Sequence, residues 1–332
     1  MKKSMKMFMT AGLAMVISLN GAAVSFAEEA AAEPASGDSR TIVMIPKIEG
    51  IRFFEMAADG ARKAGEDLGV NVIYEGTATP SAADQVALIE KYVEEGVDAI
   101  CVSPNDMAEV GAALLAAQEA GITVLDWDSQ CGEAVTTASI YNVHDKEFGE
   151  HMVDKLVEAM GTTEGQYAIV TGGLDAQNLN SWIDYGKRYA EVEYPDLELV
   201  AIPVPSDEDA DKAYKITKML LESYPDLKGI LGYSTPTGPG CAKAIQEMGL
   251  QDKVALVANG MEEDCQEYRA DGSLDCGCLW DVEKLGYLTI ATANHLLDGN
   301  QLDDSFKVEG IDSVTVSENG HNVYYTEIGN DF

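Results

Sequence analysis

Two aspartates flank a tryptophan at the end of an apolar run, in the segment ITVLDWDSQ, residues 122–130. Burying ionised carboxylates is costly unless they are paired or hydrogen-bonded. An aspartate at a strand end can accept hydrogen bonds from two neighbouring hydroxyls, and a ring beside it can cover the apolar face of a sugar. This chemistry suits a polyhydroxylated ligand. Asp128 is the expected ligand contact, and Asp126 is expected to cap the following turn.

Polar side chains interleaved with aromatic rings follow other apolar runs of the chain. Their amide and ammonium groups can donate to hydroxyl or ring oxygens, and hydrogen bonds to a charged group contribute about 1.5–3 kcal/mol each. About half of the aromatic rings are expected to be ordinary core. Phe53 and Phe54 are adjacent on a predicted helix, so their side chains are expected to point in different directions. The candidate ligand-binding set is Lys47, Phe53, Phe54, Asn105, Asp128, Asn178, Asn180, Trp182, Tyr233, Asn259, Trp280 and Asp281.

Short apolar runs alternate with segments of helical spacing, and these elements must position the candidate residues. Regular alternation of this kind indicates parallel sheets with helices on both faces. Two such runs predict an α/β protein with two doubly wound parallel-sheet lobes, whose ligands bind beyond the carboxyl ends of the strands. Strands are predicted at 41–47, 70–76, 97–103, 122–128, 165–173, 197–205, 227–234, 253–260 and 272–280. Helices are predicted at 53–69, 82–96, 108–121, 181–195, 210–225, 240–249 and 282–299.

The first residues have the pattern of an export signal. Lysines precede an apolar stretch over residues 7–24, and Ser25 and Ala27 occupy the small-residue positions of a cleavage site. A signal peptide is therefore predicted over 1–27 and a flexible tether over 28–40. A membrane anchor is the alternative, but polar residues interrupt the apolar stretch, which is shorter than the roughly 20 residues of a span. The expected location is periplasmic or extracellular.

The formal net charge of the 332-residue chain is -35. Such a surface repels nucleic acid and anionic lipid, so no nucleic-acid partner is expected. It fits a protein that handles a neutral or cationic small ligand. A monomer without cofactors is expected.

Patterns typical of enzymes and metal sites fail in this chain. The acidic run DEDADK at 207–212 lacks the later residues of a calcium loop and fits the first turn of a helix. His144 and His151 are seven apart, with no acid–cysteine cluster to complete a zinc site. A triad of Ser103, Asp128 and His144 lacks the G-x-S-x-G elbow. No catalytic residue and no metal site are therefore predicted.

The six cysteines fit buried small hydrophobic residues better than a disulfide framework. A bridge from Cys265 to Cys276 or Cys278 stays open as an alternative.

Three segments carry a family resemblance: IPKIEGIRFFEMAADGARKAGEDLGV, VLDWDSQ and LWDVEKLGYLTIATANHLLDG. They resemble the type I periplasmic sugar-binding proteins of ABC importers, closest to the autoinducer-2 and rhamnose receptor group. The resemblance implies two lobes joined by three crossover segments, near Asn142, near Trp280-Asp281 and around Phe306-Lys307. Lobe 1 would then comprise 41–141 plus 281–306, and lobe 2 would comprise 142–280 plus 307–332.

The resemblance also implies that Lys47 and Asp128 contact the ligand. Autoinducer-2 receptors use an Asp-Gln pair before a tryptophan, where this chain has Asn178 and Leu179, and their Pro-x-Ala segment falls on Tyr233-Ser234-Thr235. These departures favour a monosaccharide-like ligand held by hinge closure and delivered to an ABC permease. An autoinducer-2 receptor is the alternative, and a receptor that passes its ligand to a sensor kinase fits the sequence equally well.

A less favoured alternative is a secreted sugar-acting enzyme, which would need paired carboxylates across the cleft, such as Asp128 with Asp175 or Asp281. A transcriptional repressor of this fold would need an N-terminal helix-turn-helix, where the leader stands instead.

Overall fold

The computed structural model describes residues 39–326 and 328–332. The predicted signal peptide at 1–27 and nearly all of the predicted tether lie outside these described residues. Among the described helices, none combines the length and apolar character needed to cross a membrane.

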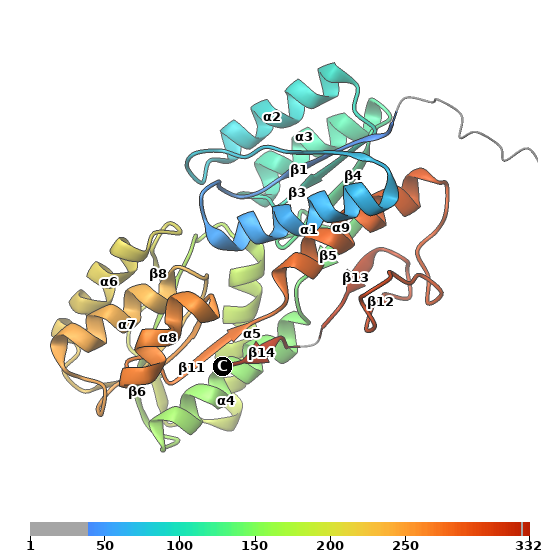
Figure 1. The fold of residues 1–332 in the computed structure, drawn as a ribbon. Coiled ribbons are helices and arrows are strands. Elements are labelled where there is room, and N and C mark those ends of the chain that lie inside the picture. The colour runs from blue at the N-terminus through green and yellow to red at the C-terminus, as the bar shows by residue number, and fades with distance from the viewer. Residues whose placement is uncertain (1–38, 327) are drawn as a thin grey trace, which may run out of the picture. The chain divides into compact units, whose positions relative to one another are not determined.

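The first lobe is built on a sheet with the strand order β12-β13-β5-β4-β3-β1-β2 (Figure 1). All neighbours pair in parallel except β12 and β13. Alternate residues of β1 enter separate apolar clusters on the two faces, as expected for a sheet covered on both sides. The strands are β1 (Thr41–Ile45), β2 (Asn71–Tyr74), β3 (Ala99–Val102), β4 (Thr123–Trp127), β5 (Ala138–Tyr141), β12 (Thr315–Val316) and β13 (Asn322–Tyr324). The helices are α1 (Arg52–Leu68), α2 (Ala82–Glu95), α3 (Met107–Glu119) and α9 (Val282–Leu297).

The second lobe has a sheet of order β14-β11-β10-β9-β6-β7, with β8 also paired to β6. Its strands are parallel except for β14, which runs antiparallel to β11. The strands are β6 (Gly165–Thr171), β7 (Leu197–Leu199), β8 (Val204–Pro205), β9 (Leu227–Gly232), β10 (Ala255–Asn259), β11 (Cys276–Leu279) and β14 (Asn330–Asp331). The helices are α4 (Asp145–Met160), α5 (Gln177–Glu193), α6 (Ala210–Ser223), α7 (Thr237–Met248) and α8 (Glu262–Asp271).

The predicted fold class, two parallel-sheet α/β lobes, is confirmed. Each predicted strand and helix has its counterpart, whereas β5, α4, α8 and the short strands after α9 were not predicted. The chain passes between the sheets after β5 and after β11, near Asn142 and Trp280.

The third passage differs from the expectation. Residues 307–332 were expected in the second lobe, but β13 pairs in parallel with β5 and Val323 is fully buried there. Only β14 joins the second sheet, so the chain crosses after Tyr324 rather than around Phe306-Lys307.

Helices α1 and α9 lie side by side and cross at two glycines (Figure 1). A Cβ on Gly286 would lie 1.8 Å from the carbonyl oxygen of Ala57, and one on Gly60 would lie 1.9 Å from that of Glu283. Only glycine permits this approach, which sets the beginning of α1 beside Trp280, with the Phe53 and Trp280 ring centroids 6.0 Å apart.

Candidate functional site

A cavity lies where residues that follow the strands of the two sheets meet. Its volume is about 30 Å³, which is room for about two water molecules and too small for a sugar ring. Both lobes contribute to its wall, so any ligand held here would contact both. The lining residues are Lys47, Phe53, Phe54, Asp128, Asn178, Leu179, Trp182, Glu208, Ser234, Thr235, Asn259, Leu279 and Trp280.

A buried ion pair forms the first-lobe wall of the cavity. The Lys47 Nζ lies 2.9 Å from the Asp128 Oδ2, and their side chains are only 4% and 5% exposed. Lys47 follows β1 and Asp128 follows β4, so the parallel sheet brings both to the same edge. Burying such a pair is weak evidence for stability, because desolvation offsets the attraction. Its position in a cavity wall therefore points to binding.

The Asp128 carboxylate is held by two further donors, Ser103 of its own lobe and Asn142 at the passage between the lobes. Ser103 Oγ donates to Oδ2 at 2.8 Å, and Asn142 Nδ2 donates to Oδ1 at 2.7 Å. The backbone of Asp128 has a φ of 62°, a region that non-glycine residues rarely adopt. Strain of this kind gathers at binding sites, where surrounding contacts fix the side chain in place.

Asn178, the second residue of α5, connects the second lobe to this pair. Its Oδ1 accepts from Lys47 Nζ at 3.0 Å, and its Nδ2 donates to Asp128 Oδ1 at 3.3 Å. The three side chains satisfy one another across the boundary between the lobes. A ligand that binds between Asp128 and the second lobe must replace these bonds with its own.

Four aromatic side chains form the apolar part of the wall. Phe53 and Phe54 pack edge to face with ring centroids 5.1 Å apart, and Trp182 and Trp280 do so at 5.5 Å. The side chains of Phe53 and Phe54 were expected to point in different directions, but both line the cavity. They do so because the cavity lies against the first turn of α1. The Trp182 Nε1 donates to Asp145 at 2.8 Å, which fixes that ring.

Glu208 is a site residue that the sequence reasoning missed. It accepts from Ser234 Oγ, lines the same cavity as Lys47 and has a φ of 58°. Burial raises the pKa of Glu208, while the charge of Lys47 acts to lower it. Glu208 precedes Asp209, which caps α6 through the Lys212 backbone nitrogen, so the predicted helix start is confirmed. Glu208 belongs to this acidic helix start, so its sequence context did not indicate that its side chain faces the cavity.

Two predicted amides lie at the site in different capacities. Asn259 lines the cavity and donates to the Cys278 carbonyl at 3.0 Å, while its Oδ1 has no partner among the described residues. Asn105 does not line the cavity; its Nδ2 donates to the Lys47 carbonyl at 2.7 Å. The buried Gln85 bridges the neighbouring strand ends by donating to the carbonyls of Pro46 and Ser103. Asn105 and Gln85 position Lys47.

Three further predicted site residues do not line the cavity. Asn180 donates to the Leu174 carbonyl at 2.6 Å and lines a separate surface depression. Tyr233 is fully buried in the second-lobe core. Asp281 caps α9 by accepting from the Lys284 backbone nitrogen at 3.1 Å. Core packing and helix capping thus account for Tyr233 and Asp281.

Asp126 and Trp127 are structural. Asp126 accepts from the Cys131 backbone nitrogen at 2.7 Å, as expected for a residue that caps the following turn, and burial raises its pKa to about 6. Trp127 is fully buried against Phe54, with ring centroids 5.9 Å apart.

All six cysteines are free, and five of them are buried. The alternative of a bridge from Cys265 to Cys276 or Cys278 is therefore not present in this structure. Burial raises the thiol pKa of Cys265 to about 12, which keeps it protonated and inert.

The chain belongs to the family described as periplasmic binding protein domain, whose profile matches residues 42–301. It is a solute-binding protein of ABC importers and not an enzyme.

Among curated relatives, the ribose import binding protein RbsB of Escherichia coli (strain K12) is 24% identical over 273 residues, which are 81% of this chain and 88% of that protein. The D-apiose import binding protein of Actinobacillus succinogenes is 22% identical over 74% of this chain and 78% of that protein. Among solved structures, LsrB from Clostridium saccharobutylicum in complex with AI-2 is 28% identical with a TM-score of 0.79, covering 88% of this chain and 96% of that one.

A solute-binding protein from Clostridium phytofermentas with bound L-rhamnose has a TM-score of 0.81 at 24% identity, covering 89% of this chain and 95% of that one. This second structural likeness shows the fold.

Proposed function

We propose that this protein captures a monosaccharide-like ligand between its two lobes and delivers it to an ABC importer in the membrane. The observation that carries the proposal is the buried Lys47–Asp128 pair in the wall of an interlobe cavity with aromatic sides. Curated relatives named for ribose and D-apiose import support a sugar as the ligand.

The chemistry of the wall matches a small polyol. The Asp128 carboxylate accepts from hydroxyls, Lys47 and Asn178 donate to hydroxyl or ring oxygens, and the rings of Phe53 and Trp280 cover apolar C–H faces. Three or four such bonds, less immobilisation costs, amount to about -8 kcal/mol, or a Kd of about micromolar.

Binding is coupled to opening and closing of the lobes. The cavity of about 30 Å³ does not hold a sugar with the side chains as they stand, so the lobes must separate to admit it. Closure over the ligand then replaces the bonds of Asn178 to Lys47 and Asp128. A ligand favours the closed state only through contacts to both lobes, and both lobes line this cavity.

A second candidate ligand is autoinducer-2. It is favoured by the 28% identity to LsrB in complex with AI-2, a likeness that covers 88% of this chain. Against it, Asn178 and Leu179 stand where an Asp-Gln pair would be expected.

Calorimetry with a panel of aldoses, deoxysugars and autoinducer-2 tests the proposal. Binding of one monosaccharide at about micromolar Kd is expected. Tight binding of autoinducer-2 with no sugar binding would establish the second candidate. Binding of neither class would overturn the proposed function.

The cellular setting follows from the same proposal. The chain is exported by a cleaved signal peptide over 1–27 and works outside the cytoplasm as a monomer, and its net charge of -35 disfavours nucleic acid. Each lobe comprises one sheet with its helices, and the chain after Tyr324 belongs to the second lobe. Mass spectrometry of the secreted protein tests whether the signal peptide is removed. Light scattering tests whether the protein is a monomer.

A further inference from the structure

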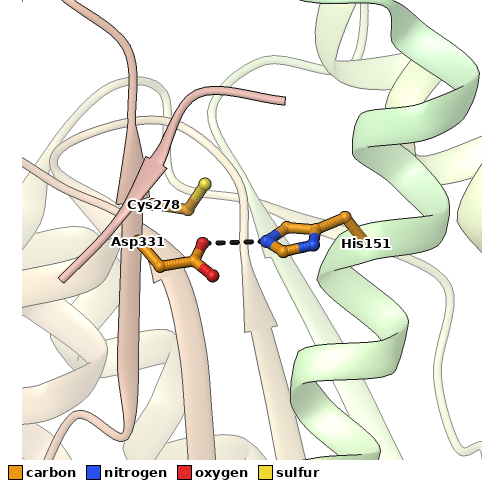
Figure 2. A group of neighbouring side chains, drawn as sticks. All are labelled: His151, Cys278 and Asp331. Atoms are coloured by element: carbon orange, nitrogen blue, oxygen red, sulfur yellow. Dashed lines mark hydrogen bonds and ion pairs between the residues drawn. The ribbon is translucent and has the colours of Figure 1, made fainter. Parts of the chain in front are cut away.

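Three side chains of different chemical type converge in the second lobe, outside the interlobe cavity. They are His151 on α4, Cys278 on β11 and Asp331 on β14, and one ligand atom of each lies within 4.8 Å of the other two (Figure 2). Figure 2 shows the imidazole directed at the carboxylate, and the His151 Nε2 is 2.8 Å from the Asp331 Oδ1. His144, the other histidine near this helix, is not part of the group and stacks on Tyr324.

The backbone arranges two of these residues in advance. Cys278 and Asp331 are direct partners in the antiparallel β11–β14 pair, and directly opposed residues point to the same face of a sheet. Reciprocal hydrogen bonds of 2.9 Å between Gly277 and Phe332 hold this register. The shared face is turned to α4, where His151 meets it. The grouping is therefore fixed by strand pairing and does not depend on one flexible side chain.

The set of donors selects a class of metal. An imidazole nitrogen, a thiolate and a carboxylate oxygen are the ligands that zinc binds, at about 2.0–2.3 Å, which places tetrahedral ligands about 3.3–3.6 Å apart. The His151–Asp331 separation needs to widen by a few tenths of an ångström to admit an ion. Sulfur is a poor ligand for calcium or magnesium, so those ions are disfavoured.

We propose that His151, Cys278 and Asp331 form a binding site for a divalent transition metal of the zinc class, with water as the fourth ligand. Cys278 is buried while Asp331 is exposed, so water and metal reach the site from the Asp331 side. Lys155 lies 3.4 Å from the Asp331 Oδ2, the oxygen that does not face His151, and orients the carboxylate from outside. Glu158 pairs with Lys155 at 3.1 Å and offsets its charge.

A bound metal would join β14 to β11 and α4. Since β14 follows the third passage between the lobes, the metal would fix the end of that connection to the second lobe. The site therefore serves stability, and it is independent of the ligand proposed for the interlobe cavity.

Titration of the reduced, chelator-treated protein with Co²⁺ tests the proposal. We expect one equivalent to bind, with a thiolate-to-cobalt charge-transfer band and the visible bands of tetrahedral cobalt. Cys278→Ser should abolish the charge-transfer band, and Asp331→Asn, at an exposed position that does not threaten folding, should weaken binding at least about tenfold. Cys276→Ser is the matched control, because Cys276 lies two residues earlier on the same strand without belonging to the group.

Thermal unfolding with and without Zn²⁺ gives a second measurement. The midpoint should rise with Zn²⁺ in the wild type and in Cys276→Ser, and should not rise in Asp331→Asn. Weak binding without a charge-transfer band, which surface carboxylates alone would give, overturns the proposal. Equal cobalt spectra for the wild type and Cys278→Ser overturn it as well.

Discussion

Replacing Asp128 by asparagine is expected to weaken ligand binding by about thirtyfold to a hundred-and-fiftyfold and to leave the fold intact. Hydrogen bonds to a charged group contribute about 1.5–3 kcal/mol, against about 0.5–1.5 kcal/mol between neutral groups. Two ligand hydroxyls donating to the carboxylate, one to each oxygen, therefore lose about 2–3 kcal/mol together. Asp128→Ala removes both acceptors and should cost about a hundred- to ten-thousandfold in affinity.

The surroundings of Asp128 explain why the asparagine variant should fold. Lys47 can only donate, so the new amide nitrogen must take the Oδ1 position, which faces the Asn142 amide. Asn142 can turn its own amide and present its Oδ1, an atom with no hydrogen-bond partner in residues 39–326 and 328–332. Two groups stay uncompensated, the Lys47 ammonium and the Asn178 amide nitrogen that donates to the same Oδ1, and separation of the lobes returns both to water.

Three measurements decide the prediction. Calorimetry with the ligand found by the sugar panel gives the affinity, thermal unfolding gives the stability, and small-angle scattering reports lobe separation. Asp175→Asn, at an exposed acid outside the cavity wall, is the control and should bind as the wild type does.

A double variant separates loss of binding from loss of structure. Breaking a buried pair by removing one partner costs about 3–5 kcal/mol, whereas replacing both partners by apolar residues of similar size is often neutral. Lys47→Met combined with Asp128→Asn removes both charges and keeps a residue that tolerates the φ of 62°, so this double variant should unfold near the wild-type temperature and bind no sugar. If Asp128→Asn binds within about threefold of the wild type, or the double variant binds the sugar, the ion pair is not the ligand contact.

The remaining predictions concern a second carboxylate, a helix crossing and a buried acid. Glu208→Gln should weaken sugar binding about fivefold to tenfold by calorimetry, while Asp211→Asn on the same acidic segment should have no effect. Gly286→Ala should lower the free energy of unfolding by about 1–3 kcal/mol, because its Cβ would meet the Ala57 carbonyl at 1.8 Å, while Glu283→Ala should change it little. Folding raises the pKa of Asp126 to about 6. The contribution of Asp126 to the free energy of unfolding is therefore fully present below about pH 4 and is lost as the pH rises through 6, by at most about 3 kcal/mol. Asp126→Asn should remove this slope in denaturant unfolding measured from pH 4 to 7, and an unchanged slope would show that Asp126 does not cause it.

Parallel-sheet topology made the strand ends predictable, and with them Lys47 and Asp128. Helical periodicity would have shown that only one of the two asparagines of α5 faces the cavity. Asn178 and Trp182 are four apart and share a face, whereas Asn180 lies between them in sequence and faces elsewhere. After β9 the alternation places Tyr233 in the core, and Ser234, with a φ of 90°, turns to the cavity.

Other parts of the site depend on contacts far apart in sequence. Glu208 reads as one acid of a helix start, and only the packing of the second lobe turns it toward Ser234. The His151 group requires knowing that β14 pairs with β11, yet β14 has only two residues and no apolar pattern. The late strands β12 and β13 escaped prediction for the same reason, because they are too short for a periodic pattern.

The mutual satisfaction of Lys47, Asp128 and Asn178 also determines which ligands the proposed site rejects. Closing over a ligand breaks the two bonds of Asn178, and a buried charge left without a partner costs more than a neutral hydrogen bond returns. An apolar molecule of the right size would leave the Lys47 ammonium and the Asp128 carboxylate without hydrogen-bond partners. The empty closed state, in which Asn178 bonds to both, would therefore be favoured over the complex. A ligand must therefore offer at least one donor to Asp128 and one acceptor to Lys47 at positions that correspond to the two ends of the Asn178 amide. Adjacent hydroxyls of a sugar ring meet this requirement, since each can both donate and accept. Selectivity then arises from competition with the Asn178 amide. Asn178→Ala removes this competitor together with one ligand donor, so it should broaden the range of polyols bound in the calorimetric panel while weakening the binding of the preferred one.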